Sequence, residues 1–192
     1  LAIEQALPKQ TKNKDHRKAL PYDQVKDCLN AISSSKAGPR TKLALEFLIL
    51  TASRSGEVRE AVWSEIDLDN REWLIPATRM KSKTDHRVPL VSRMVEILKE
   101  VDNLRDGSPL VFPGTVFGRP ISDASMLKLV RSLGYQVDVH GFRTSFRTWA
   151  QERTNAPREV VEKALAHSIG NKTEEAYARS DLFEKRRSLM GN

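Results

Sequence analysis

The chain has 192 residues, of which 39% are hydrophobic; this fits one domain or one and a half with a sizeable core, and excludes an intrinsically disordered chain. Lys and Arg outnumber Asp and Glu by 32 to 25, and a net charge of +7 favours a polyanion such as nucleic acid as partner, although a merely basic protein has the same composition. The single cysteine, Cys28, excludes an internal disulfide framework and a multi-cysteine zinc site, and indicates a reducing cytoplasm.

The beginning of the chain carries no targeting signal. The first residues lack the charge, apolar core and cleavage site of a signal peptide, and no apolar run approaches the length of a membrane span, so we expect no membrane partner. The chain starts at Leu rather than Met, which indicates an excerpt of a longer protein. Residues 8–18 are polar and basic without apolar periodicity. We therefore assign residues 1–19 to a linker or arm of a missing N-terminal region, and 20–192 to one domain.

Apolar residues at helical spacing, with Pro, Ser, Asp and Gly at the ends, predict a chain made mainly of helices. Helices are expected at 21–33, 40–53, 55–61, 92–106, 122–133, 140–153, 157–167, 173–178 and 181–190, with Ser92 and Asp181 as caps. Extended segments are expected at 72–77 and 87–91, after the turn residues Asp69 and Asn70. The fold class is thus mainly α with a small antiparallel β-sheet.

Four residues of the last third of the chain stand at informative spacings. His140 and Arg143 form an H-x-x-R pattern, and His167 and Tyr177 follow them. By composition H-x-x-R alone is expected roughly 0.4 times by chance, so it is a weak signal, and the conjunction with the later His and Tyr is much stronger.

An arginine pair and a tyrosine match the chemistry of phosphodiester cleavage. The guanidinium forks of Arg54 and Arg143 can neutralise the negative charge that develops when a nucleophile adds to a phosphate. Tyr177 can store the bond energy in an enzyme ester, with His140 or His167 assisting its deprotonation. No convincing carboxylate cluster for a two-metal nuclease accompanies these residues, so we expect neither metal nor cofactor.

The leaving sugar oxygen needs a proton, and a lysine beside other cations is a suitable general acid. The segment RMKSKTDHR supplies the candidates. If it is extended, Arg79, Lys81 and Lys83 alternate onto one side and concentrate positive charge at a hairpin tip. We expect Arg79, Lys83 and Arg87 to contact DNA.

These residues resemble the C-terminal catalytic domain of the tyrosine recombinases of phages and integrative genomic islands. The likeness covers roughly residues 20 to 190, and is carried by TASRSGEVREAVWSEID, MKSKTDHRVPL, HGFRTSFRTWA, LAHS and EEAYARSD. The resemblance implies that Tyr177 forms a 3′-phosphotyrosyl link and that Arg54 and Arg143 bind the scissile phosphate. It implies that His140 and His167 hold and tune that phosphate, and that Glu57 supports the site. The active lysine of the family lies about eight residues before the proline of the returning strand, which selects Lys81 over Lys83.

The resemblance also implies partners: double-stranded attachment-site DNA, further copies of the chain forming a tetramer on DNA, and accessory DNA-bending factors in a bacterial cytoplasm. The arm-binding and core-binding domains usual in such integrases are missing from this sequence, so we expect it to bind DNA poorly alone.

Alternative interpretations of the same residues remain open. A type IB topoisomerase uses the same cleavage chemistry. A non-catalytic DNA-binding domain of the same fold carries out no cleavage. Taken singly, Arg54 can be a helix-end cation, His140 a core histidine and Tyr177 a surface residue. The terminal apolar residues Leu182, Phe183, Leu189 and Met190 pack either in cis or, as we slightly favour, on a neighbouring protomer.

Overall fold

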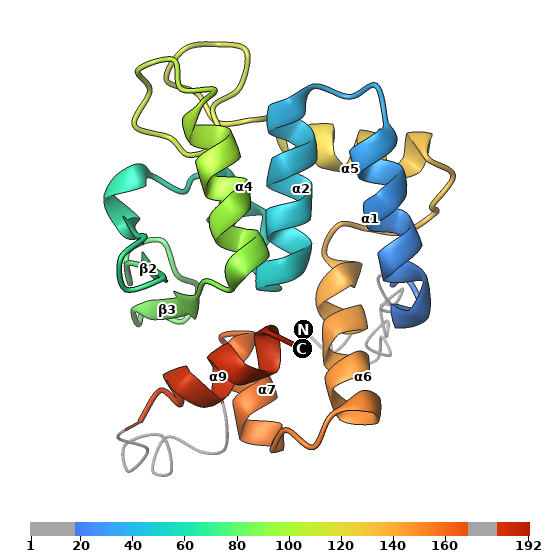
Figure 1. The fold of residues 1–192 in the computed structure, drawn as a ribbon, viewed down its shortest axis with the longest axis vertical. Coiled ribbons are helices and arrows are strands. Elements are labelled where there is room, and N and C mark those ends of the chain that lie inside the picture. The colour runs from blue at the N-terminus through green and yellow to red at the C-terminus, as the bar shows by residue number, and fades with distance from the viewer. Residues whose placement is uncertain (1–17, 169–179) are drawn as a thin grey trace, which may run out of the picture.

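The apolar run that begins at Pro39 forms α2 (Pro39–Thr51), the central helix in the upper half of the computed structural model (Figure 1). Because α2 is apolar almost all round, it is buried on several sides. It packs against α1 (Val25–Ser34), α3 (Ser55–Arg59), α4 (Ser92–Asp102) and α5 (Asp123–Ser132). The structure describes residues 18–168 and 180–192. The expected class, mainly α with a small antiparallel sheet, is confirmed.

The sheet has three short antiparallel strands in the order β1 (Ile66–Asp67), β2 (Glu72–Ile75) and β3 (His86–Pro89). Trp73 pairs with Val88 and both side chains are buried against the core around α2. The short 3-10 turns Tyr22–Gln24 and Trp63–Glu65 precede α1 and β1. Both predicted strands are present, and each is shorter than expected.

The segment between β2 and β3 is not extended, so the predicted alternation of Arg79, Lys81 and Lys83 onto one side is wrong. The amides of Arg79 and Lys83 donate to carbonyls three residues earlier, which makes successive turns, and Lys83 has a φ of 58°. The Asp85 carboxylate accepts the Ala77 N–H at 2.7 Å and closes the loop at its base. Aspartate in this position competes with the sheet ladder for backbone donors.

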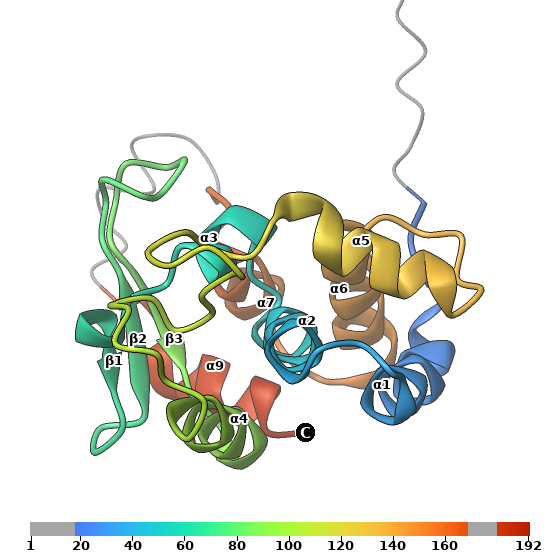
Figure 2. The same ribbon diagram turned by 90° about the horizontal axis from the view of Figure 1, so that it is seen from above.

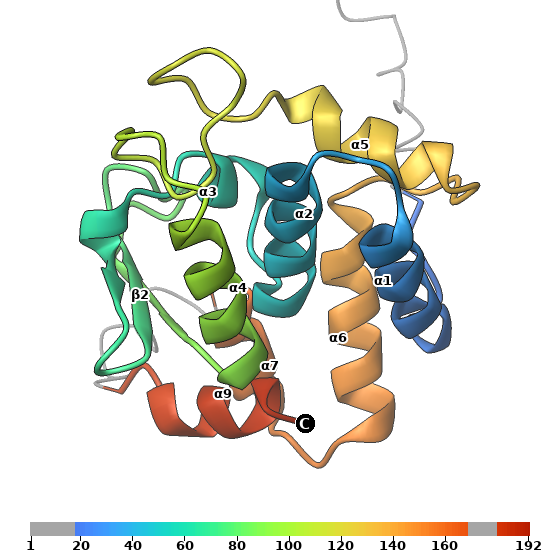
Figure 3. The ribbon, with the colours of Figure 1, turned by 45° about the horizontal axis from the view of Figure 1, so that its top comes forward.

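A second, smaller apolar cluster lies at the end of α2. It is built by α6 (Gly141–Arg153), α7 (Arg158–Ala164) and α9 (Phe183–Met190), which correspond to three predicted helices. Figure 3 shows one of these helices, α9, below α2. Ala52, the residue that ends α2 with a φ of 49°, is buried in this second cluster. The end of α2 therefore joins the two clusters.

Several helix ends differ from the sequence prediction. Asp181 does not cap the last helix: α9 begins at Phe183, and its cap is Leu182 with a φ of 57°. Ser92 is the first residue of α4 rather than its cap, which is Val91. The helix α7 stops at Ala164 instead of His167, because Ala166 adopts a φ of 49° and the His167 N–H donates to the Glu162 carbonyl at 2.9 Å. This reversal turns His167 back along α7. The helix predicted at 173–178 lies outside the described residues.

The terminal helix α9 packs on α7 and β3 of its own chain. The guanidinium of Arg186 is buried, and it donates to the Asp181 carbonyl at 2.8 Å, to the Asp181 carboxylate at 2.9 Å and to the Arg87 carbonyl. The Arg87 guanidinium lies over the Phe183 ring, and its central carbon is 4.0 Å from the ring centre. The terminal apolar stripe, for which the sequence slightly favoured a neighbouring protomer, thus has a site in cis.

Among residues 18–168 and 180–192, no helix combines the length and the apolar character needed to cross a membrane.

Candidate active site

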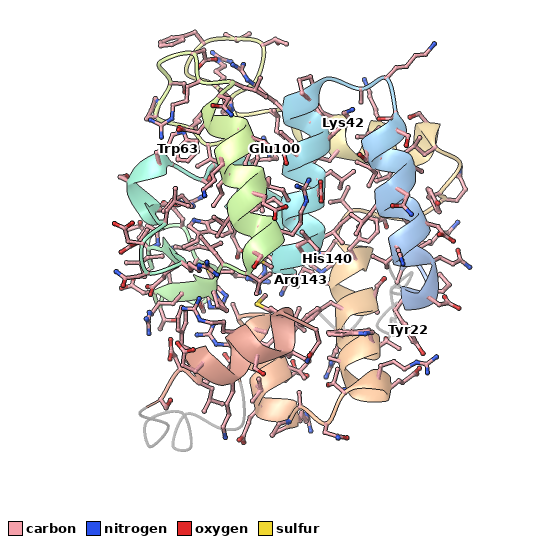
Figure 4. All side chains as sticks on the ribbon, viewed as in Figure 1. Tyr22, Lys42, Trp63, Glu100, His140 and Arg143 are labelled. Atoms are coloured by element: carbon pink, nitrogen blue, oxygen red, sulfur yellow. The ribbon has the colours of Figure 1, made fainter. Side chains whose placement is uncertain are left out.

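Of the five predicted catalytic residues that the structure describes, four lie near the end of α2 and the start of α6: Arg54, His140, Arg143 and His167. Figure 4 labels two of them, His140 and Arg143. The fifth, Lys81, lies on the β2–β3 loop. His140 caps α6 and its carbonyl accepts the Arg143 N–H at 3.2 Å. Arg143 lies one turn into α6, and His167 follows α7. Arg54 caps α3, directly after the end of α2. Segments far apart in sequence therefore supply one group of cationic and imidazole side chains.

Arg143 is 4% exposed and ties this group together. One terminal nitrogen donates to the Ala52 carbonyl; the other donates to the Leu165 carbonyl at 2.6 Å and lies 3.1 Å from His167 Nε2. Burial, and secondarily the positive charge of Arg54, lower the pKa of Arg143 to about 10. The guanidinium is still charged at neutral pH, and within the described residues it forms no ion pair with a carboxylate. Its hydrogen-bond partners are neutral groups, and the Glu57 carboxylate offsets its charge only in part. Such a buried cation is costly unless an anion joins it.

Glu57 fixes Arg54 beside Arg143. Its carboxylate accepts the backbone N–H and the Nη1 donor of Arg54, both at 2.7 Å. Glu57 is 5% exposed, whereas the Arg54 side chain is 25% exposed. This contact fixes one side of the Arg54 guanidinium and leaves the rest accessible to solvent. Two arginines, one buried and one partly open, form the geometry that can clamp a phosphate.

His167 has a carboxylate partner that sequence spacing did not suggest. Its Nδ1 lies 2.7 Å from Oε2 of Glu162, five residues earlier, and the other Glu162 oxygen forms a 2.5 Å ion pair with Arg147. Glu162 is buried at the inner end of this contact, and its pKa is lowered by His167 and Arg147, which outweigh the opposing effect of burial. The i, i+5 spacing becomes a contact only because of the reversal at Ala166.

The candidate DNA-binding residues differ in how free they are. Arg79 forms a 2.6 Å ion pair with Glu65, and Arg87 pairs with Glu72 at 2.7 Å and with Asp181 at 3.3 Å. Lys81 and Lys83 are exposed on the β2–β3 loop. That loop, α3 and α5 lie along the same side of the molecule, at the upper edge of Figure 2. The DNA contacts of these residues remain predictions. Arg79 and Arg87 would have to bind a phosphate while they are paired with their carboxylates.

His86 belongs to the site and was missed by the sequence analysis. It begins β3 on the same side as the buried Val88, since alternate strand residues share a face. Burial chiefly, and the charges of Arg186, Arg143 and Arg54, lower its pKa to about 4, with Glu57 acting in the opposite sense. His86 is therefore a neutral imidazole at neutral pH within the field of the arginines. The signal that could have found it is the strand period, which extends one residue further toward the N-terminus than the predicted strand.

Tyr177 lies outside the described residues. The nearest described residue after it, Ser180, lines a cavity of about 600 Å³ together with His86, His167 and Arg186. Lys163 and Ser82, from α7 and the β2–β3 loop, line the same cavity. Ser180 therefore shares this cavity with His167, which contacts Arg143.

A glycine in the H-x-x-R segment allows the start of the chain to cross α6. A Cβ placed on Gly141 would overlap the Lys18 carbonyl oxygen and lie 2.8 Å from Ala19 Cα. We expect Gly141→Ala to destabilise the fold by about 1–3 kcal/mol, since backbone cannot move aside as a side chain can. Urea unfolding measures this. Gly56→Ala is the matched control because nothing lies within 4 Å of that Cβ, and a helical alanine should stabilise slightly. Equal unfolding midpoints for both variants would contradict the crossing.

Among the residues that the structure describes, no group of three or more His, Cys, Asp and Glu side chains is placed to hold a metal ion. The prediction that the protein works without a metal or a cofactor rests on the sequence alone.

Comparisons with known proteins agree on one family. A family model described as the phage integrase family matches residues 18–182. The prophage integrase IntA of Escherichia coli K12 is 33% identical over 183 residues, which is 92% of this chain and 44% of the relative. The integrase of Enterobacteria phage P4 is 30% identical over 193 residues, 91% of this chain and 44% of the relative. The chain therefore spans less than half the length of these two relatives.

Solved structures show the same fold. The integrase from mycobacterium phage Brujita superposes with a TM-score of 0.69 at 19% identity, covering 96% of this chain and 60% of that chain. A lambda integrase dimer bound to a COC' core site superposes with a TM-score of 0.60 at 21% identity, covering 88% of this chain and 62% of that chain.

Proposed function

Because this chain belongs to the phage integrase family, we propose that it is the catalytic domain of a tyrosine-type site-specific DNA recombinase. The substrate is a phosphodiester of double-stranded attachment-site DNA. The reaction integrates or excises a mobile element by cutting and rejoining strands without water, metal or ATP.

One observation carries this proposal: a buried, charged Arg143 that lacks a carboxylate partner in the described part of the chain, with Arg54 beside it. A guanidinium carries more N–H donors than the three contacts of Arg143 use. A scissile phosphate is the anion that would complete this site. The two arginines would then stabilise the extra negative charge of the five-coordinate phosphorus, as preorganised donors do in other enzymes.

The proposed reaction proceeds in two balanced steps. The Tyr177 oxygen attacks phosphorus and loses its proton to a site imidazole, and the bond from phosphorus to the 5′ oxygen breaks. Lys81 gives that oxygen its proton. The 3′ end stays joined to Tyr177 as a phosphotyrosyl ester. A 5′-hydroxyl of a second duplex then attacks the ester and gives its proton to the neutral Lys81, while the protonated imidazole returns its proton to the released Tyr177 oxygen. The bond energy is thereby conserved.

Tyr177 and the arginines belong to one active site in this proposal. Three peptide units separate Tyr177 from Ser180, and such a segment spans at most about 11 Å. Ser180 lines the cavity beside His167, and Asp181 is bound by Arg186 of the same chain. Chain connectivity therefore favours a tyrosine that acts beside the His167 of its own chain, and hence beside Arg143, which His167 contacts.

The proposal extends to organisation. Residues 1–19 serve as a basic linker or arm from an N-terminal region, and residues 20–192 as the catalytic unit. The solved lambda integrase is a dimer on its core site. We propose that the present protein also acts as an oligomer on DNA, a tetramer at strand exchange, in the bacterial cytoplasm with accessory DNA-bending factors.

One experiment separates this function from its rivals. The longest form of the protein that its gene encodes is incubated with a pair of attachment sites and with a supercoiled plasmid lacking them. Strand exchange between the sites supports a recombinase. Relaxation alone indicates a type IB topoisomerase, and binding without any covalent protein–DNA complex indicates a DNA-binding domain that has kept the fold.

The choice of lysine gives a separate prediction. Lys81→Ala should slow strand cleavage roughly a hundredfold or more, the loss typical of a missing general acid. Lys83→Ala, the matched control on the same loop, should cost less than about tenfold, since it only contacts phosphate. The measurement is the rate of covalent complex formation on a nicked suicide substrate.

The acid role of Lys81 has a specific control. A substrate whose 5′ bridging oxygen is replaced by sulfur releases a thiolate, which leaves without a proton. It should restore cleavage to Lys81→Ala. An equal loss for both lysines, or rescue of Lys83→Ala instead, would contradict the assignment.

A further inference from the structure

Four side chains form a continuous chain of polar contacts that runs from the surface of α6 to the arginine at the centre of the site. It is Arg147, Glu162, His167 and Arg143, in that order, and we call it the relay. Its links are the 2.5 Å ion pair between Arg147 and Glu162, the 2.7 Å contact between Glu162 and His167 Nδ1, and the 3.1 Å contact between His167 Nε2 and Arg143. Arg147 and Glu162 take no direct part in the proposed cleavage steps.

The relay fixes which nitrogen of His167 carries a proton. Glu162 is ionised, since its pKa is lowered, and a carboxylate accepts hydrogen bonds only. The proton of a neutral imidazole must therefore lie on Nδ1. On the other side, Arg143 can only donate, so the Nε2 atom that it approaches must present its lone pair. Both neighbours demand the same tautomer.

Burial makes Glu162 the anchor of this arrangement. Its side chain is 8% exposed, whereas those of His167 and Arg147 are 39% and 41% exposed. The carboxylate is held by the helix α7, and its two oxygens face α6 and the turn after α7. A partly exposed imidazole on a turn would otherwise sample several rotamers.

We propose that Glu162, held by Arg147, is a positioning residue that locks His167 as an acceptor at Nε2, facing the phosphate-binding face of Arg143. This inference rests on the proposed function and deepens it. With the lone pair of Nε2 held toward the phosphate site, His167 can accept a proton there during the reaction, and Glu162 stabilises the resulting cation. A histidine without Glu162 has neither the orientation nor the compensating charge.

The test uses three variants of the chain. Glu162→Ala removes the acceptor, Glu162→Gln keeps an acceptor oxygen without charge, and Arg147→Met removes only the outer link. Glu159→Gln is the matched control, because it removes a carboxylate from an exposed position one turn earlier on α7. Thermal unfolding of each variant shows that the fold is retained.

The first readout needs no DNA. In the free protein at mildly alkaline pH, ¹⁵N-histidine NMR should show His167 protonated at Nδ1, with a low-field proton resonance that exchanges slowly with water. His167→Gln assigns the signal. Glu162→Ala should abolish that resonance, Glu162→Gln should shift it upfield, and Glu159→Gln should leave it unchanged. A signal that is the same in wild type and Glu162→Ala would overturn the proposal.

The second readout is covalent complex formation on a suicide substrate. Glu162→Ala should slow it by roughly ten- to a hundredfold, as expected for a lost charge-assisted hydrogen bond. Glu162→Gln and Arg147→Met should each slow covalent complex formation less than Glu162→Ala does. If wild type forms no covalent complex while the NMR result holds, the proposed function fails and the tautomer assignment stands. Normal cleavage by Glu162→Ala would show that the relay has no positioning role.

Discussion

Arg143→Lys is expected to reduce strand cleavage by roughly a thousandfold, because lysine cannot reproduce the bidentate donation of a guanidinium to the transition-state phosphate. The structure adds a second reason. The two terminal nitrogens of Arg143 reach the Ala52 carbonyl at the end of α2 and the Leu165 carbonyl at the end of α7. A single ammonium cannot satisfy both, so one buried carbonyl loses its donor.

The same substitution should cost about 1–3 kcal/mol of unfolding free energy, the usual penalty for a buried polar group left without a partner. Urea denaturation and single-turnover cleavage, run on the same preparation, separate the two effects. Arg153→Lys is the matched control: it changes the same side-chain type at the exposed end of α6, where Arg153 contacts the Tyr22 hydroxyl. A folded Arg143→Lys protein that cleaves within tenfold of wild type would rule out the proposed role of Arg143.

Tyr177→Phe is expected to remove all detectable covalent protein–DNA complex, since the change deletes the one oxygen that bonds to phosphorus. Affinity for site DNA should stay within a fewfold of wild type, because that oxygen contributes little to binding the phosphate backbone. Gel-shift titration and denaturing electrophoresis of the suicide reaction measure the two quantities. Tyr135→Phe is the matched control on a half-buried tyrosine remote in sequence.

Mixing variants extends this prediction to the cis arrangement. Tyr177→Phe and Arg54→Ala proteins, combined on one substrate, should yield no more covalent complex than either alone. Restored cleavage in the mixture would mean that the tyrosine attacks at the arginine site of another protomer, contrary to the proposal.

The sequence predicted what depends on local pattern. The apolar run of α2, the stripe of Phe142, Phe146 and Trp149 on α6, and the family motifs were enough for the fold class and for the residues that converge on Arg143. Helix ends set by Pro and Ser signals were right within a few residues, as at Ser122 before α5. These features rest on side chains that are close in sequence.

What the sequence did not predict depends on single backbone choices. A non-glycine residue with positive φ, Ala166, ends α7 early and places His167 over Glu162. The Asp85 contact closes the β2–β3 loop into turns, so the cations there do not alternate. His86 enters the site through a strand that begins one residue earlier than the pattern suggested. In each case a left-handed residue or a contact between separate segments overrides the local secondary-structure propensity.

The central claim, that Tyr177 joins DNA while the two arginines hold the phosphate, is tested most directly by locating the covalent bond. The longest form of the protein is trapped on a nicked attachment-site substrate and digested, and the DNA-linked peptide is identified by mass spectrometry. We predict one adduct, a 3′-phosphate on Tyr177, with a free 5′-hydroxyl on the released strand. An adduct on any other residue, or cut strands that carry a 5′-phosphate and no attached protein, would contradict the claim.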